Sequence, residues 1–115
     1  TSKEHIAITT SLEPPRCMTI DPNRQILYTT QGQGIMRIDL NNGQKDQNGR
    51  IIATTLAGSS EFGDFGSKDG KITDNPPPSF HSPRGITINL DDPAYPKGIL
   101  YVADRNGIRK IILHD

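Results

Sequence analysis

The sequence has a single cysteine, Cys17, so it cannot form an internal disulfide, and this one thiol assigns no cellular compartment. Lys plus Arg and Asp plus Glu number 13 each, which gives no formal net charge at pH 7. Domains that bind a phosphate backbone normally carry a basic excess, and this chain has no run of Lys or Arg. Nucleic acid is therefore not an expected partner.

Long apolar runs are also missing, and no stretch approaches the roughly 20 apolar residues that a membrane span needs. No signal peptide is recognisable, and the chain opens on Thr1, as expected of a fragment or a processed product. The sequence contains no nucleophile motif, Walker loop or dinucleotide fingerprint. We therefore expect no cofactor, and the sequence leans away from an enzyme. Its 115 residues allow at most one domain.

What the chain does have is an internal repeat. Residues 15–21 (PRCMTID) align with 83–89 (PRGITIN), and 26–40 (ILYTTQGQGIMRIDL) align with 99–113 (ILYVADRNGIRKIIL). Of these 22 aligned positions, 11 are identical. A repeat of this kind indicates a unit that cannot bury its apolar face alone and needs a stacked neighbour.

Short runs of β-branched and aromatic residues alternate with turn residues along the whole chain, which predicts an all-β fold. The expected strands are 5–11, 16–21, 25–30, 34–40, 50–56, 85–89, 98–103 and 107–113. Asp21-Pro22-Asn23-Arg24 and Asn106-Gly107 have the composition of tight turns. If each unit has four strands, the chain holds the last strand of one unit, one complete unit, and three strands of the next. This order is a repeated antiparallel meander, the way in which β-propellers are built.

One long segment interrupts the pattern. Residues 57–82 are rich in Gly, Ser, Asp and Pro and hold all three phenylalanines, Phe62, Phe65 and Phe80. A loop of this length is unusual in a compact domain and is either functional or an ordered irregular segment. Its aromatic residues favour a loop that packs back on the fold.

The second copy resembles the NHL-repeat family of β-propellers. The likeness rests on Thr55-Leu56-Ala57-Gly58, on Pro83-Arg84-Gly85-Ile86, and on the pairing of Leu100-Tyr101-Val102-Ala103-Asp104 with Ile108-Arg109-Lys110-Ile111. It is close over 55–113 and degenerate over 14–56. The first copy departs from the family pattern at Cys17 and Gln31, and the insertion 91–97 lengthens one turn of the second copy.

The resemblance implies a partial propeller over 1–115. Residues 1–13 would be the last strand of a preceding blade, 14–57 a full blade, 58–82 a long inter-blade loop, and 83–115 the first three strands of the next blade. The positions that it marks as structural are Pro15, Tyr28, Gly34, Pro83, Gly85, Tyr101, Asp104 and Gly107. Among them, the glycine at 85 would permit a close approach of blades, and both tyrosines would fill the space between blades.

Propellers usually bind partners on the face formed by the loops before the first strand and between the second and third strands of each blade. The residues that these loops offer here are Arg16, Arg84, His81, Phe62 and Phe65. Arg16 and Arg84 occupy the same position in the two copies and would form part of a positive ring for carboxylates or phosphates. The alternative is that each guanidinium pairs with a nearby acidic side chain or backbone carbonyl.

A metal site has weaker support. His81 precedes an inner strand, but His5 and His114 lie in partial blades and complete no ligand set. Asp64, Ser67, Asp69 and Asp74 lack the alternating spacing of an EF-hand loop, so turn chemistry explains them better. We predict no metal ligands.

The sequence thus predicts a non-enzymatic protein-interaction module that binds a protein partner through its loop face. The alternative is a fragment of a metal-dependent propeller enzyme of the lyase or lactonase type. Two blades cannot close a propeller, which takes four to eight. The missing blades would come from the remainder of a longer chain or from further copies, three of which would supply six blades.

Overall fold

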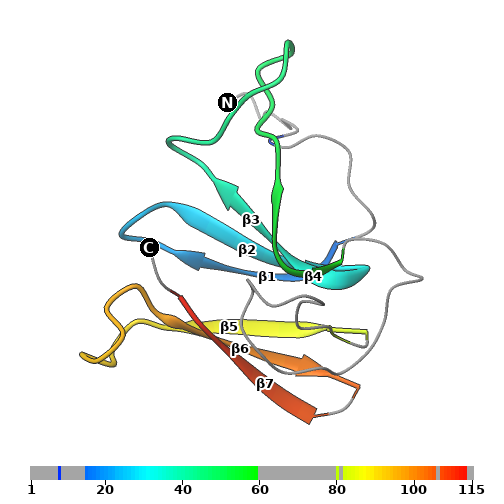
Figure 1. Cartoon of the computed structure of the whole chain (residues 1–115). Helices are drawn as coiled ribbons and strands as arrows, with labels where there is room; N and C mark the ends of the chain where they lie inside the picture. Colours follow the sequence, from blue (N-terminus) through cyan, green and yellow to red (C-terminus); the bar gives the residue numbers. More distant parts are fainter. Residues whose placement is uncertain (1–7, 9–14, 60–79, 81, 106, 114–115) are drawn as a thin grey trace, which may run out of the picture.

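The computed structural model describes residues 8, 15–59, 80, 82–105 and 107–113. Within these residues every regular element is a strand, and the strands form two antiparallel sheets that lie one above the other (Figure 1). The first sheet contains β1 (Pro15–Asp21), β2 (Ile26–Gln31), β3 (Gln33–Asp39) and β4 (Thr54–Ser59) in that order. The second contains β5 (Gly85–Asn89), β6 (Ile99–Asp104) and β7 (Gly107–Ile112). The all-β prediction is therefore confirmed. The described residues include no helix that could span a membrane.

The aligned segments of the sequence pair in the same register. Met18 lies opposite Thr29 in the first sheet, and their aligned residues Ile86 and Val102 lie opposite each other in the second. The same holds one strand further on, where Tyr28 faces Arg37 and Tyr101 faces Lys110. The sequence repeat is thus a repeat of the β1-β2-β3 meander, strand for strand.

The side chain of Asp21 fixes the turn after β1. The Oδ1 atom of Asp21 accepts hydrogen bonds from the backbone N–H groups of Asn23 and Arg24, at 2.9 and 3.2 Å. Such a turn mimics a backbone turn and ends the strand. Gln25 then takes a φ of 58° before β2 begins. The second copy replaces this four-residue connection by residues 90–98, where the sequence carries its insertion.

The strand expected at 50–56 is wrong in its position, because β4 begins only at Thr54 and continues to Ser59. The Oδ1 atom of Asp46 accepts hydrogen bonds from the N–H groups of Asn48 and Arg50, at 2.9 and 3.0 Å. This turn folds residues 44–52 back on themselves, with one isolated bridge between Lys45 and Ile51. The β-branched residues near 51 are therefore held in a separate small hairpin and not in the sheet.

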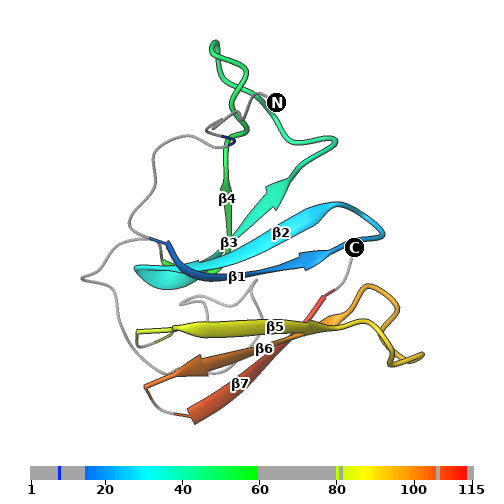
Figure 2. The ribbon, with the colours of Figure 1, turned by 180° about the vertical axis from the view of Figure 1, so that it is seen from behind.

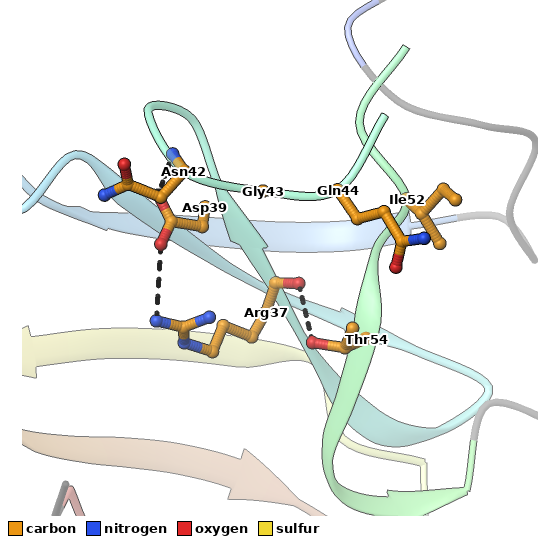
Figure 3. A pocket seen from close by; sticks show the side chains of 7 residues that line it. All are labelled: Arg37, Asp39, Asn42, Gly43, Gln44, Ile52 and Thr54. Atoms are coloured by element: carbon orange, nitrogen blue, oxygen red, sulfur yellow. Dashed lines mark hydrogen bonds and ion pairs between the residues drawn. The ribbon is translucent and has the colours of Figure 1, made fainter. Parts of the chain in front are cut away.

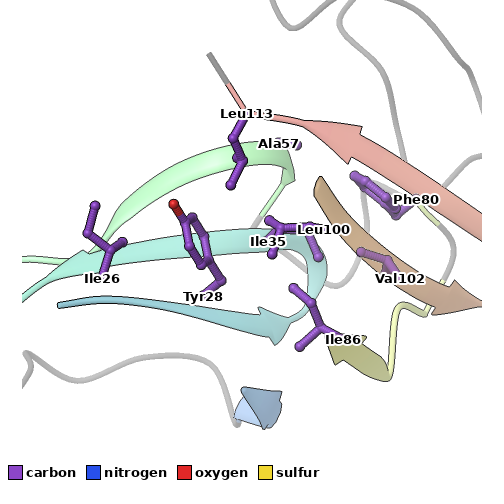
Figure 4. Packing of buried hydrophobic residues seen from close by; sticks show 9 residues of the cluster. All are labelled: Ile26, Tyr28, Ile35, Ala57, Phe80, Ile86, Leu100, Val102 and Leu113. Carbon is purple, nitrogen blue, oxygen red and sulfur yellow. The ribbon is translucent and has the colours of Figure 1, made fainter. Parts of the chain in front are cut away.

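The core lies between the two sheets (Figure 4). Its buried members are Ile26, Tyr28, Ile35, Ala57, Phe80, Ile86, Leu100, Val102 and Leu113. Alternation along each strand sends every second side chain into this space. Ile35, Leu100 and Val102 are completely buried, so truncating any of them would leave a cavity that costs about 2–5 kcal/mol.

Candidate functional site

The loop face predicted from the sequence corresponds to one end of the molecule. β1 and β5 begin there, and the turns β2–β3 and β6–β7 lie beside these starts, at the left of Figure 2. The pairing of Pro15 with Gln31 and of Gly85 with Ala103 fixes this arrangement in both sheets. We call this end, with Arg16, Arg84 and Arg105 on it, the arginine end.

A buried hydroxyl joins the two sheets at the arginine end. Thr30 is fully buried, and its Oγ1 accepts a hydrogen bond from the Cys17 N–H at 3.2 Å and donates one to the Arg84 carbonyl at 3.0 Å. The Arg84 N–H in turn donates to the carbonyl of Ala103 at 2.9 Å. The backbones next to Arg16 and at Arg84 are therefore held on the two sides of one hydroxyl group.

The charged groups of this end are exposed. Arg16 and Arg84 are solvent-exposed, and neither forms an ion pair with any residue that the structure describes. Of the two interpretations given by the sequence, the described contacts favour a pair of available guanidinium groups. Planar guanidinium groups bind carboxylates and phosphates through two parallel hydrogen bonds.

Sequence reasoning missed a third arginine. Arg105 lies in the turn between β6 and β7, is exposed, and makes no ion pair within the described part of the chain. Its aligned residue in the first copy is Gly32, so the repeat gave no hint of it. Its place in a loop between second and third strands was the signal that could have found it.

The described carboxylates lie away from this end, with one exception. Asp104 ends β6, but its side chain is completely buried and its Oδ2 lies 3.6 Å from Nη1 of Arg109. Asp21 and Asp39 close β1 and β3 at the opposite end. The exposed described charge at the arginine end is consequently positive, although the chain as a whole is neutral.

The structure changes the expectation for one structural position. Among the described residues, a Cβ added at Gly85 would meet the Cβ of Ala103 at an ordinary 3.7 Å, so the packing of these two sheets does not require glycine there. The close approach occurs at Gly58, where φ is +71° and an added Cβ would lie 2.5 Å from the Gln33 carbonyl oxygen. Gly34 lies opposite this residue, and an added Cβ at Gly58 would be 3.0 Å from its Cα.

The remaining predicted positions are placed as follows. Pro83 is buried, and the preceding Ser82 takes a φ of 51° and donates its N–H to Oε1 of Gln33 at 2.6 Å.

Gly107 takes a φ of 130° directly after the β6–β7 turn, where glycine is favoured. Pro15 begins β1 and is exposed. His81, Phe62 and Phe65 lie outside the described residues.

The two repeat tyrosines have different surroundings. Tyr28 is 4% exposed and belongs to the core, whereas Tyr101 is half-buried on the far side of the second sheet. Burial raises the pKa of the Tyr28 phenol above its usual value of 10.0, and the nearby Arg37 guanidinium opposes this shift. Tyr28 therefore stays neutral at any pH at which its unfolded counterpart is neutral.

A hollow lies at the end of the first sheet opposite the arginine end, beside the 44–52 hairpin (Figure 3). It has a volume of about 170 Å³ and is lined by Arg37, Asp39, Asn42, Gly43, Gln44, Ile52 and Thr54. Its polar groups are engaged with one another. Arg37 Nη2 lies 3.6 Å from Asp39 Oδ2, and Asp39 Oδ1 accepts the N–H groups of Asn41 and Asn42. These polar groups therefore stabilise the turn after β3 and are already engaged within the chain, so they are poor ligand-binding groups.

Metal-ligating residues are sparse in the described part of the chain, which holds no group of three His, Cys, Asp or Glu side chains suited to a metal ion. The three histidines lie outside it. Cys17 is a free thiol, half-buried in β1 and packed against the core, as expected of a small core residue.

No family model, curated protein or solved structure matches this chain. The site is therefore interpreted from its own geometry.

Proposed function

We propose that this chain is a non-enzymatic protein-interaction module built from NHL-type propeller blades, and that it binds an acidic segment of a protein partner at the arginine end. The observation that carries the proposal is the set of exposed guanidinium groups of Arg16, Arg84 and Arg105, which form no ion pair with any residue that the structure describes. The repeated meander supports the blade interpretation, since each sheet buries one face on the other.

The choice of a protein partner follows from charge and scale. Three guanidinium groups suit a short run of carboxylates, which they bind in a bidentate manner. A nucleic-acid groove would need a basic excess extended over many phosphates, and the chain has no net charge. The missing blades of the propeller would be supplied by a longer chain or by further copies.

The test is a titration of a fluorescently labelled oligoglutamate peptide, followed by fluorescence polarisation. Arg84→Glu should weaken binding about tenfold or more, because it removes one charge-assisted contact and adds repulsion. Arg50→Glu is the matched control, since Arg50 is also exposed but lies in the 44–52 hairpin. It should leave the affinity within about twofold of the unchanged chain.

A parallel titration with single-stranded RNA separates the two anionic partners. Equal losses for both variants would contradict the proposal, as would tighter binding of RNA than of peptide with a steep dependence on salt. Circular dichroism of each variant must match that of the unchanged chain, so that a loss of binding is not a loss of folding.

A further inference from the structure

Each sheet has an outer face that the other sheet does not cover. In the first sheet this face carries Met18 and Ile20 on the edge strand β1, because their neighbours Cys17 and Thr19 point toward the second sheet. Thr29 and Ile38 lie on the same side of β2 and β3 but are buried, so the open part of this face lies on β1. In the second sheet it carries Tyr101 and Ile108, because Leu100, Val102 and Ile111 point into the core. We call these the first and second outer faces.

Both outer faces expose large apolar side chains. Met18 is 64% exposed and Ile20 38% on the first outer face, and Ile108 is 74% exposed on the second. Lone exposed apolar residues are common on proteins and need no explanation. The positions of Met18, Ile20 and Ile108 in the repeat are unusual for exposed residues.

Each of the three aligns with a residue that is buried at the sheet–sheet interface in the other copy. Met18 aligns with Ile86, a core residue that is 8% exposed, and Ile20 aligns with Ile88, which packs against the core. Ile108 aligns with Ile35, which is completely buried. The exposed residues therefore stand at positions that the fold uses for packing one sheet on another.

The two outer faces are consequently complementary to each other. The second outer face, with Tyr101 and Ile108, is the repeat of the inner face of the first sheet, with Tyr28 and Ile35. The open β1 part of the first outer face, with Met18 and Ile20, is the repeat of Ile86 and Ile88 on the inner face of the second sheet. The interface inside the chain already shows how faces of these two kinds pack together.

We propose that a second copy of this chain docks head to tail, with its first outer face on the second outer face of the first copy. This contact continues the interface that already joins the two sheets within one chain. It is heterologous, so it leaves one free face at each end and can close into a ring. It does not depend on partner binding at the arginine end.

The repeat also predicts how this contact differs from the one inside the chain. Thr30, whose hydroxyl links β1 to the residue before β5, aligns with Ala103. The contact between copies therefore lacks the buried hydroxyl bridge and rests on apolar packing of Met18 and Ile20 around Tyr101. We expect it to be weaker than the packing of the two sheets in one chain and to depend on protein concentration.

The test is the solution mass of the 115-residue chain and its variants by light scattering after size-exclusion chromatography. The unchanged chain should have at least twice the mass of a single chain. Met18→Glu places a charge on the first outer face and Ile108→Glu places one on the second. Each variant alone should therefore have the mass of one chain. Ile52→Glu is the control, because Ile52 is exposed but lies at the end of the 44–52 hairpin, away from both outer faces named above, and it should keep the mass of the unchanged chain.

Mixing the two variants is the decisive step. Met18→Glu retains an intact second outer face and Ile108→Glu an intact first outer face, so an equimolar mixture should form a dimer of one chain of each. Formation of this dimer also shows that both variants are folded. A single-chain mass for the unchanged protein, or self-association that survives both substitutions, would overturn the proposal. So would a mixture that stays monomeric while the unchanged chain associates.

Discussion

Two consecutive threonines in β2 show how the direction of one side chain decides its role. Thr30 points between the sheets, where its hydroxyl bonds to Cys17 and Arg84. Thr29 points the other way and is 4% exposed, and its buried Oγ1 has no hydrogen-bond partner among the residues that the structure describes. Its aligned residue in the second copy is Val102. A buried hydroxyl is stabilising only when it is hydrogen-bonded.

The same substitution should therefore have opposite effects at these two neighbours. Thr29→Val removes an unpaired hydroxyl and should raise the free energy of unfolding by about 1 kcal/mol. Thr30→Val leaves the Cys17 N–H and the Arg84 carbonyl unpaired and should lower it by about 2 kcal/mol. Urea denaturation of both variants measures the difference. Effects of the same sign at both positions would contradict the assigned directions.

The core position of Tyr28 gives the molecule a dependence on alkaline pH. Burial raises the pKa of its phenol, so as pH rises past about 10 the unfolded chain loses this proton before the folded one. The contribution to stability is complete below the unfolded pKa and is lost as pH rises through the folded value. Tyr28→Phe should flatten the alkaline decline in the free energy of unfolding. An unchanged slope in denaturation series from about pH 8 to 11 would refute this.

The ion pair between Asp104 and Arg109 is a difference between the two copies, although their strands pair in the same register. Arg109 lies 3.6 Å from Asp104 and 4.7 Å from the centre of the Phe80 ring. The first copy has Gln31 and Met36 at the aligned positions, and the buried Oε1 of Gln31 has no hydrogen-bond partner in the described part of the chain. The first copy thus keeps the register and loses the ion pair.

At the scale of elements, the close packing of β4 against β3 and Phe80 depends on one glycine. Gly58 has a φ of +71°, and an added Cβ would collide with the Gln33 carbonyl and with the Phe80 ring. Gly49, in the 44–52 hairpin, has a similar φ of +78° but nothing within 4 Å of an added Cβ. An alanine at either position would strain the backbone, but at Gly58 it would also clash with neighbouring atoms.

Alanine at the two positions should therefore differ in its cost. Gly49→Ala should lower the free energy of unfolding by about 1 kcal/mol through backbone strain alone. Gly58→Ala adds displacement of β3 and should cost about 3 kcal/mol or more. Thermal denaturation of the pair measures this, and equal losses would contradict the close packing described at β4.

The strands that belong to the repeat could be predicted from the sequence, because hydrophobic alternation and turn residues agree there. The strand near 50–56 was misplaced because the Asp46 side chain builds a turn that draws Ile51 away from the sheet. Alternation alone carries no information on such a side-chain bond. The long connection over 90–98 was visible as an insertion, but its conformation was not predictable.

The candidate site was predictable only in part. Arg16 and Arg84 were found because the repeat aligns them, and the structure places both at one end. Arg105 has no aligned counterpart, and its importance follows from the geometry of the β6–β7 turn. The ends of strands meet through the tertiary fold, so a sequence read alone shows such a cluster only where its members repeat.

At the scale of the whole molecule, charge and apolar surface are separated. The arginine end carries exposed positive charge, and the outer faces of the two sheets carry the exposed Met18, Ile20 and Ile108. The two proposals therefore place an acidic partner at one end of the molecule and a further copy on the outer faces of the sheets. Charge reversal at Arg84 should therefore leave the solution mass unchanged.

The central claim is that Arg16 and Arg84 act as one binding site because Thr30 holds their strands together. A double-mutant cycle on oligoglutamate binding tests it most directly, with Arg16→Glu and Arg84→Glu measured singly and together by fluorescence polarisation. Residues that share a ligand show a coupling energy of about 0.5 kcal/mol or more. We expect such a coupling, with the double variant losing less binding free energy than the sum of the two single losses. Strict additivity, or no loss in either single variant, would contradict it.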